Sequence, residues 1–294
     1  MGPSRSTLPD GRAHFQHGPI DLVIAAEGEA FAIQAAHDAA WQRFGTLLPE
    51  LVAELALLRT PIGGGDCPLH GAVARRMWTA CAPFQGGFIT PMAAVAGSVA
   101  QEIVAHYARA GIARAWVNNG GDIALHLVPG ASVRVGLWAD IARFAGFASR
   151  QALPTDAQFA VTAAMPVRGV ATSGWRGRSF SLGIADSVTV LARDAASADA
   201  AATVIANAVN VDDVRIERRP ADQIKDDSDL GAIPVTVDVP PLPPARVDQA
   251  LQAGLDCAQA LQARGLVWQA ALVCQGRWRT TDAMDDTGAW QLVQ

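Results

Sequence analysis

The sequence has little positive charge and no stretch suited to a membrane. Lysine occurs once, at Lys225, and the formal net charge is −5 with a pI of about 5.6. Phosphate backbones are bound mainly by clustered cations, so a chain without a Lys/Arg block is a poor partner for nucleic acid. No run of about 18 uninterrupted apolar residues occurs, so no membrane-spanning helix is expected.

The cysteine and histidine patterns of common metal and redox sites are also missing. The six histidines show no HExxH spacing. The cysteines form no CxxC pair and lie far apart, at Cys67, Cys81, Cys257 and Cys274. Such thiols fit a reducing compartment. The first residues have no apolar run of signal-peptide length, so we expect a cytoplasmic protein.

The composition that remains is that of a folded protein with a large core. Half of the 294 residues are hydrophobic and 17% are charged, which allows a sizeable core to be buried. Helical patterns alternate with strand patterns, and a helix followed by two strands occurs twice. We therefore predict an α+β fold with helices layered on antiparallel sheets and an internal duplication. Residues 1–294 are taken as one domain.

The first half of the chain predicts helices separated by glycine and proline. After a polar lead-in and one strand, a helical stretch is expected up to residue 59. Pro49 should end one helix and open the next, because proline lacks an amide donor. Thr90 and Pro91 form a good helix start, and Gly111 a good stop.

The second half predicts strands around a glycine pair, then a helix, an arm and a last helix. Strands are expected at 113–119 and 122–128, and a helix at 194–210. Residues 212–245 are polar and then proline-rich with no period, so we expect a surface arm without regular structure. A helix at 247–265 and a final strand complete the prediction.

The stretch Asn-Asn-Gly-Gly-Asp permits two interpretations. Gly120 and Gly121 tolerate positive φ, and Asn-Gly is a favoured hairpin turn, so a plain hairpin is the first. The second is a ligand loop, because missing Cβ atoms let a phosphate or a flavin ring reach backbone amides. The side chains at its rim would be Asn118, Asn119 and Asp122.

A second polar stretch is Thr172, Ser173 and Gly174, followed closely by Arg176. Hydroxyls and amides at a strand end suit an anionic group, and the arginine guanidinium binds phosphate and carboxylate oxygens. Trp175 lies inside this candidate site. A solvated polar turn is the alternative interpretation.

Two further pairs of residues are candidates for metal binding and for catalysis. Asp199 and Thr203 are four residues apart on a predicted helix, so they share one face and offer hard oxygen ligands for Mg²⁺. A capping role near the helix N-terminus is the alternative for Asp199. Cys67 and His70 lie in a glycine-rich loop and could pair as nucleophile and base, although this spacing in a loop proves no geometry.

Taken in order, these pieces resemble a known family. The small-residue helix, WVNNGGDIAL, ATSGWR, DSVTVLA and SADAAATVIAN are similar to the ApbE family of FAD:protein FMN transferases, and more closely to its uncharacterised ApbE-like branch. The resemblance covers about residues 85–210. It implies a mixed α/β fold related to the T-fold. It also implies an activity in which FAD is split with Mg²⁺ and FMN is attached to a Thr or Ser of a target protein.

The resemblance also implies roles for particular residues. Asp199 and Thr203 match the family's metal ligands, and Ala96-Gly97 stands where the transferases carry a Lys-Gly pair. The residues that match its nucleotide-site motifs are Gly120, Gly121, Asp122, Thr172, Ser173 and Gly174.

The sequence departs from the transferases at several of these positions. Besides Ala96, Ser98 replaces an aromatic residue and Gln101 replaces an aspartate. The His, Asp-Pro and Thr-Gly that follow the Thr-Ser-Gly turn have no clear match in SFSLGIADS. The metal pair can therefore persist where flavin transfer does not.

Three functions remain open. The first is an ApbE-like enzyme that uses Mg²⁺ on FAD or on a related nucleotide or phosphorylated metabolite. The second is an enzyme for a small organic substrate, with His70, Cys67 or Asp122 as candidate catalytic groups. The third is a non-catalytic protein that binds FAD or FMN. The small-residue helices favour a homodimer.

Overall fold

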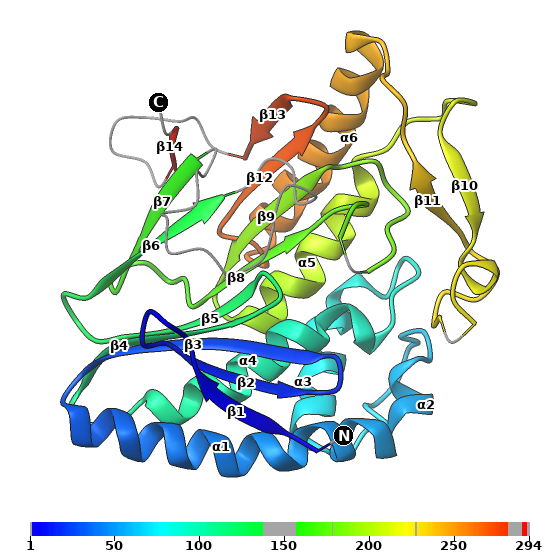
Figure 1. Cartoon of the computed structure of the whole chain (residues 1–294). Coiled ribbons are helices and arrows are strands. Elements are labelled where there is room, and N and C mark those ends of the chain that lie inside the picture. Colours follow the sequence, from blue (N-terminus) through cyan, green and yellow to red (C-terminus); the bar gives the residue numbers. More distant parts are fainter. Residues whose placement is uncertain (1, 138–156, 178, 227, 282–289, 293–294) are drawn as a thin grey trace. The chain divides into compact units, whose positions relative to one another are not determined.

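The computed structural model describes residues 2–137, 157–177, 179–226, 228–281 and 290–292. It has a mixed α/β architecture with a large antiparallel sheet (Figure 1), which confirms the predicted fold class. The chain divides into two compact units. The first comprises residues 1–133, 161–171 and 192–200, and the second comprises 134–160, 172–191 and 201–294.

The strands of the first unit follow the order β1-β2-β3-β4-β5-β8, with antiparallel neighbours. Their bounds are β1 Ser4–Thr7, β2 Ala13–His17, β3 Ile20–Gly28, β4 Ile112–Asn119, β5 Asp122–Leu127 and β8 Gly169–Ser173. The polar lead-in forms two strands, β1 and β2, that were not predicted. Alternate side chains of β2, namely Ala13, Phe15 and His17, are buried, and this alternation gives a strand one apolar face.

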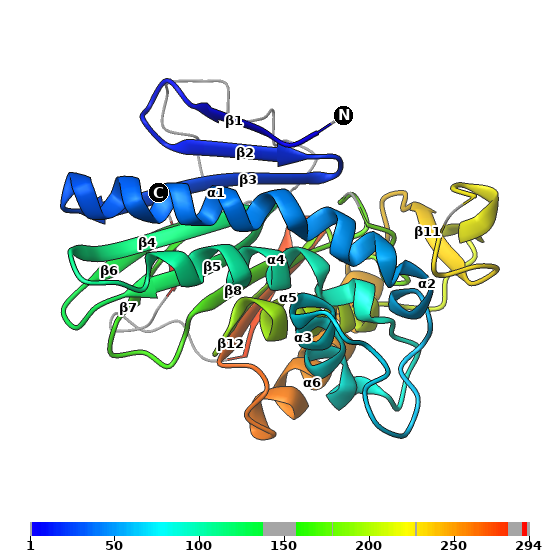
Figure 2. The ribbon, with the colours of Figure 1, turned by 90° about the horizontal axis from the view of Figure 1, so that it is seen from below.

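The first unit also contains helices. They are α1 Ala30–Ala53, α2 Leu55–Leu58, α3 Ala72–Cys81, α4 Val95–Val104 and the start of α5 Ala195–Ala208. α1 packs on β2 and β3, and α4 packs beside it on β4 and β5 (Figure 2). The core between them includes Leu22, Ile24, Phe44, Val99 and Val117. Burying each such side chain contributes about 1.5–3 kcal/mol.

Pro49 does not divide the first long helix. α1 continues through it, so this prediction was wrong. Leu47 and Leu51 on either side of Pro49 are buried. Their packing on the core outweighs the hydrogen bond that proline cannot donate, a case of tertiary contacts overriding local preference.

The helix expected from Thr90 to Gly111 is three shorter pieces. A 3₁₀ turn covers Pro91–Ala94, α4 covers Val95–Val104, and a second 3₁₀ turn covers Ala105–Tyr107. The α-helical hydrogen bonds therefore begin later than the sequence predicts. At that delayed start, the amides of the first α4 turn meet a side chain from a distant helix, described below.

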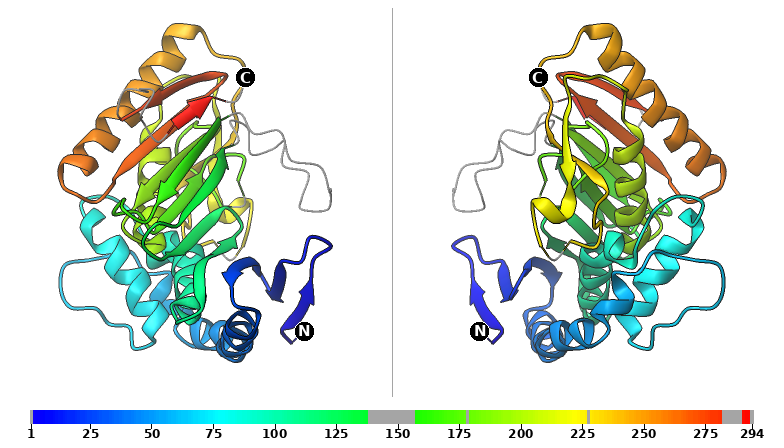
Figure 3. Two further views of the ribbon diagram at one scale, coloured as in Figure 1. Left: turned by 90° about the vertical axis from the view of Figure 1, so that its left-hand side faces the viewer. Right: turned by 90° about the vertical axis from the view of Figure 1, so that its right-hand side faces the viewer.

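The second unit has its own strands and a long helix. β9 Ser187–Ala192, β12 Gln269–Cys274 and β13 Arg277–Thr280 follow the order β9-β12-β13. α6, Pro244–Ala263, packs on β12 and β13 (Figure 3). A small sheet has the order β14-β7-β6, with β6 Ser132–Leu137, β7 Ala157–Thr162 and β14 Trp290–Leu292.

The segment predicted as an irregular arm is partly a hairpin. Within residues 212–245, β10 Glu217–Pro220 pairs antiparallel with β11 Pro234–Asp238. The prediction of no regular structure was wrong, because strands of four or five residues are too short to show a period. Val235 and Thr236 are buried, and the prolines lie at the paired ends, where a missing amide matters least.

The predicted order of a helix followed by two strands occurs once in each unit. α4 precedes β4 and β5 in the first, and α6 precedes β12 and β13 in the second. Both hairpins turn through two residues of positive φ, Gly120-Gly121 and Gln275-Gly276, as type I′ turns require. In the described part of the chain no helix is both long and apolar enough to span a bilayer.

Candidate functional site

Helices α4 and α5 meet in the first unit at a glycine. Gly97 lies in the first turn of α4, and a Cβ there would come within 2.2 Å of the carbonyl oxygen of Ala195, the first residue of α5. Backbone atoms cannot turn aside as a side chain can, so only glycine fits this contact. Gly97, predicted as a ligand residue, thus also has a packing role.

Asp199 binds amides at the start of α4. The Gly97 N–H donates to Asp199 Oδ2 at 2.9 Å, and the Ala96 N–H also donates to this carboxylate. These first-turn amides have no acceptor within their own helix, and the negative charge suits the positive end of the helix dipole. α5 itself is capped by Asp194, whose Oδ1 accepts the Ser197 N–H at 2.8 Å.

The contact between the two helices is reciprocal. Gln101 of α4 accepts a hydrogen bond from the Ala196 N–H in the first turn of α5, at 3.2 Å. Each helix therefore provides a side-chain oxygen to the other's N-terminus, which fixes where Asp199 lies. The glutamine that replaces the aspartate expected from the resemblance keeps this acceptor.

The turn between β4 and β5 lies beside the start of α4. The φ angles of Gly120 and Gly121 are 69° and 117°, and Asn119 pairs with Asp122 across the turn. The hairpin interpretation is therefore confirmed. The ligand interpretation stays a prediction, and a Cβ at Gly121 would meet no atom within 4 Å, so space for a ligand exists beside it.

Two asparagine side chains fix this turn. Asn118 Oδ1 accepts the Gly121 N–H at 2.8 Å, closing the turn. Asn119 Nδ2 donates to the Ala96 carbonyl at 3.2 Å and so ties the hairpin to α4. The predicted rim residues Asn118 and Asn119 thus support the backbone, and Asn119 is buried.

Asp199 lies in an environment that opposes its negative charge. Part of the residue reaches solvent, yet its carboxylate is enclosed by protein, and burial raises the pKa of Asp199 well above its ordinary value. The charge of Asp122 raises this pKa further, against the lowering effect of the two amides. The thiol of buried Cys81 also has a raised pKa, through burial and then through the charge of Asp199.

The predicted metal pair lies on one helix, as expected. Asp199 and Thr203 are both partly exposed residues of α5, and Thr203 belongs to the second unit. Among the residues that the structure describes, no group of three or more His, Cys, Asp or Glu side chains could hold a metal ion. A cation here would therefore depend on few protein ligands, as Mg²⁺ sites completed by water and phosphate oxygens do.

The Thr-Ser-Gly turn lies in the second unit, where a hydrogen bond and a close backbone contact fix its conformation. Thr172 Oγ1 and Thr189 Oγ1 lie 2.9 Å apart in a hydrogen bond. A Cβ on Gly174 would lie 2.4 Å from the Asp186 carbonyl oxygen, so glycine permits this close approach. Ser173 is partly exposed. The anion-binding role of this turn and of Arg176 stays a prediction.

Cys67 and His70 are close in sequence but do not interact. The Cys67 thiol donates to the Leu69 carbonyl at 4.0 Å. The amides of His70 and Gly71 donate to the Glu54 carboxylate at 2.6 and 2.8 Å, which caps α3. Within the described residues no hydrogen bond joins Cys67 to His70, so their nucleophile–base pairing has no support from this geometry.

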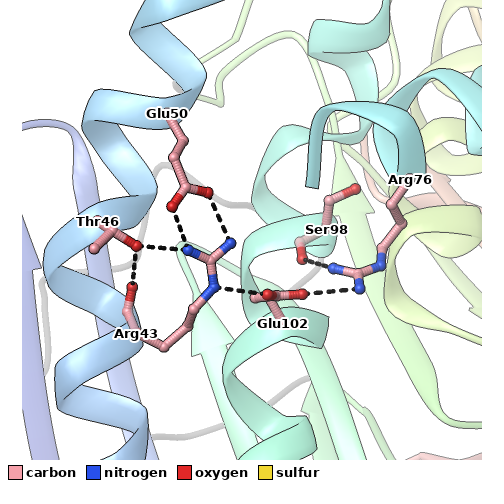
Figure 4. A network of polar contacts seen from close by, with 6 residues as sticks. All are labelled: Arg43, Thr46, Glu50, Arg76, Ser98 and Glu102. Atoms are coloured by element: carbon pink, nitrogen blue, oxygen red, sulfur yellow. Dashed lines mark hydrogen bonds and ion pairs between the residues drawn. The ribbon is translucent and has the colours of Figure 1, made fainter. Parts of the chain in front are cut away.

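A network of charges that the sequence analysis missed holds α1, α3 and α4 together (Figure 4). Arg43 of α1 makes a two-pronged contact with Glu50 at 2.6 and 2.8 Å and donates to Glu102 of α4 at 2.8 Å. Arg76 of α3 contacts Glu102 at 2.9 Å and the Ser98 carbonyl at 3.1 Å. The seven-residue spacing of Arg43 and Glu50 on one helix was the available signal.

We expect Glu102→Gln to cost more stability than Glu50→Gln. Burial opposes ionisation of Glu102, but the hydrogen bonds from Arg43 and Arg76 outweigh it and lower its pKa. Glu102 is 17% exposed and Glu50 43%, so we expect losses of about 1–3 kcal/mol and below about 1 kcal/mol respectively. Urea denaturation at pH 7 measures both.

The stability lost in Glu102→Gln should depend on pH. Because the pKa of Glu102 is lowered by folding, its contribution is present above the ordinary glutamate pKa and is lost as pH falls through the lower folded value. Equal losses for the two variants at pH 7 would contradict a bracing role for Glu102.

The chain matches a family model and several known proteins. The family model described as "AbpE bacteria" matches residues 5–280. A UPF0280 protein of Methanosphaerula palustris is 36% identical over 204 residues, covering 67% of this chain and 77% of that protein. A UPF0280 protein of Methanosarcina acetivorans is 31% identical over 207 residues, covering 70% and 76%.

A solved structure was also found. The apo crystal structure of the Pseudomonas stutzeri flavinyl transferase ApbE is 12% identical, with a TM-score of 0.45, and the match covers 95% of this chain and 93% of that one. The family resemblance predicted from the ordered motifs is confirmed by the match over residues 5–280.

Proposed function

This chain belongs to the ApbE-like family whose model spans residues 5–280, and on that premise we propose that it is a Mg²⁺-dependent enzyme that cleaves FAD or a related nucleotide. Family membership supports the reaction class. The support for a metal comes from the charges of the first unit.

The observation that carries the metal proposal is the repulsion between Asp199 and Asp122. The charge of Asp122 opposes ionisation of Asp199, whose carboxylate water reaches poorly. A divalent cation beside them removes this cost. Mg²⁺ commonly uses one or two carboxylates, with waters and substrate phosphates completing its shell. Thr203, one helical turn after Asp199, provides a further hard oxygen.

The reaction that fits these groups is cleavage of a pyrophosphate. Water adds across the P–O–P bond of FAD, so FMN and AMP are the products. Mg²⁺, when bound, supplies charge neutralisation for the phosphate leaving group. Asp199 would hold the ion, Asp122 is the candidate acid–base group, and the open backbone at Gly121 would face the ligand.

The chain's departures from the transferases favour hydrolysis over flavin transfer to protein. Ala96 replaces the lysine of the Lys-Gly pair, and no His follows the Thr-Ser-Gly turn within SFSLGIADS. Within the second unit, the hydroxyls of Thr172 and Ser173 and the guanidinium of Arg176 are of the kind that suits phosphate oxygens.

The test is FAD cleavage by the purified protein with Mg²⁺ and with chelator, beside Asp199→Asn. Asparagine keeps an oxygen for the Gly97 amide and removes the charge. We expect FMN and AMP to form only with Mg²⁺, and the variant to lose activity by at least about 100-fold, the scale of removing a group that stabilises transition-state charge.

Asp194→Asn is the matched control. It removes a charge from the start of the same helix, and asparagine caps as well as aspartate does, so cleavage should persist. Turnover of a small organic compound unaffected by chelator would support the second function. Tight FAD binding without cleavage would support the third and remove the hydrolytic proposal.

A further inference from the structure

A serine, a histidine and an aspartate lie in a row across the first three strands of the first unit. Ser6 of β1 pairs in register with His14 of β2, and Ser6 Oγ lies 3.3 Å from His14 Nδ1. On the other side of the ring, His14 Nε2 lies 2.8 Å from Oδ1 of Asp21 in β3. A hydroxyl beside a base that a third group orients is the arrangement used in nucleophilic catalysis.

The strand register places these three side chains on one face of the sheet. Val23 of β3 lies directly opposite His14. Asp21, two residues before Val23, shares its face because side chains alternate along a strand, so Asp21 is a diagonal neighbour of His14. The other face of β2 carries the buried residues Ala13 and Phe15. The three polar side chains therefore lie on the face of β2 away from these apolar residues.

The aspartate determines which ring nitrogen of His14 carries the proton. An ionised carboxylate only accepts hydrogen bonds, so in the neutral ring Nε2 carries the proton that Asp21 accepts. The lone pair of Nδ1 then faces the Ser6 hydroxyl, which donates to it, as a general base requires. The distance of 3.3 Å between Ser6 Oγ and His14 Nδ1 belongs to the looser range that free enzymes show before substrate binds.

The nucleophile is accessible while its base is partly shielded. The four residues of β1, Ser6 among them, are exposed, whereas the His14 side chain is 25% exposed. β1 is also the first strand in the order of its sheet. An edge strand presents backbone N–H groups on its open side, and such donors stabilise the oxyanion that forms when a hydroxyl attacks a carbonyl.

We propose that Ser6 is a reactive nucleophile that accepts an acyl group from a small activated ester or thioester. Ser6 Oγ forms a bond to the carbonyl carbon, and the bond from that carbon to the leaving alcohol or thiol breaks. The hydroxyl proton passes to His14 Nδ1 and from there to the leaving group. The products are acylated Ser6 and a free alcohol or thiol. Asp21 is a positioning residue that holds the ring in the required tautomer. This inference is independent of the proposed function.

The test is reaction of the full chain with p-nitrophenyl acetate, followed by release of p-nitrophenol and by mass spectrometry of the peptides. We expect the acetyl group on Ser6. His14→Gln should slow acetylation of Ser6 by about 100-fold or more, the contribution of a general base. Asp21→Asn should also slow it, and should move the ¹⁵N signals of the His14 ring away from those of the tautomer protonated at Nε2.

Ser4→Ala is the matched control. Ser4 is an exposed serine of the same strand and face, two positions earlier, and lies opposite Gln16 instead of a histidine. Ser4→Ala should leave the rate unchanged, whereas Ser6→Ala should abolish the reaction. If His14→Gln fails to fold, the position of the acetyl group in the wild type decides, and acetylation of Ser6 but not of Ser4 upholds the proposal. Equal acetylation of both serines, no acetyl group on Ser6, an unchanged rate in His14→Gln, or a wild-type His14 ring protonated at Nδ1 alone overturns it.

Discussion

Asp199→Asn should make the protein more stable at pH 7 while removing the stabilisation that Mg²⁺ provides. Folding raises the pKa of Asp199, first through burial and then through the charge of Asp122. Its ionised form is therefore a cost to the folded state at neutral pH. Removing the charge should therefore raise the free energy of unfolding at neutral pH.

The gain should vanish in acid. Below the ordinary aspartate pKa the carboxyl is protonated in both the folded and the unfolded chain, so the wild type and the variant should then be equally stable. As pH rises through the higher folded pKa, the wild type loses stability relative to Asp199→Asn. Denaturation curves between pH 3 and pH 8 measure this difference.

With Mg²⁺ present, the wild type should become more stable than Asp199→Asn. An ion that binds only the folded wild type stabilises it in proportion to the logarithm of its concentration over Kd, and the variant should show no such rise. Asp194→Asn, which keeps its cap, is the control and should respond to Mg²⁺ as the wild type does. Equal stabilisation of wild type and Asp199→Asn by Mg²⁺ would rule out Asp199 as a ligand.

Gly97→Ala should destabilise the protein by about 3 kcal/mol or more. Helix propensity alone would favour alanine by about 1 kcal/mol. The added Cβ, however, would lie 2.2 Å from the Ala195 carbonyl oxygen and 2.9 Å from Asp199 Cβ. Relieving that clash requires α5 to move away from α4, at the cost expected for an overpacked core.

Gly45→Ala is the matched comparison, because Gly45 also lies within a helix, α1, and a Cβ there would meet no atom within 4 Å. That variant should be more stable by about 0.5–1 kcal/mol. The same substitution in two helices should thus have opposite signs in urea denaturation. A stabilised Gly97→Ala would show that α4 and α5 do not approach as closely as described.

The parts of the fold that could be predicted from the sequence are those determined by residues close together along the chain. The strands around Gly120-Gly121 and the helix from Asp194 onward follow from local pattern and turn chemistry. Pro49 was misread because its effect depends on how Leu47 and Leu51 pack. The short hairpin within 212–245 was missed because so few residues show no period.

The candidate site was predicted in its residues but not in its arrangement. The Gly97 amide and the Asp199 carboxylate are 102 positions apart, and no local pattern links them. The resemblance marked both residues, yet only the structure shows that Asp199 caps α4. Asp122 was expected as a rim residue. Its influence on the pKa of Asp199 depends on how far the start of β5 lies from the start of α5, and this distance cannot be read from local patterns.

Position 96 contributes to this region through its main chain alone. The Ala96 N–H donates to Asp199 and its carbonyl accepts from Asn119, while the residue is partly exposed. Any L-residue except proline provides the same two groups, so the side chain can be exchanged without dismantling the helix start. Exchange of alanine for lysine at this position would therefore add a cation at the start of α4 while these two backbone hydrogen bonds stay the same.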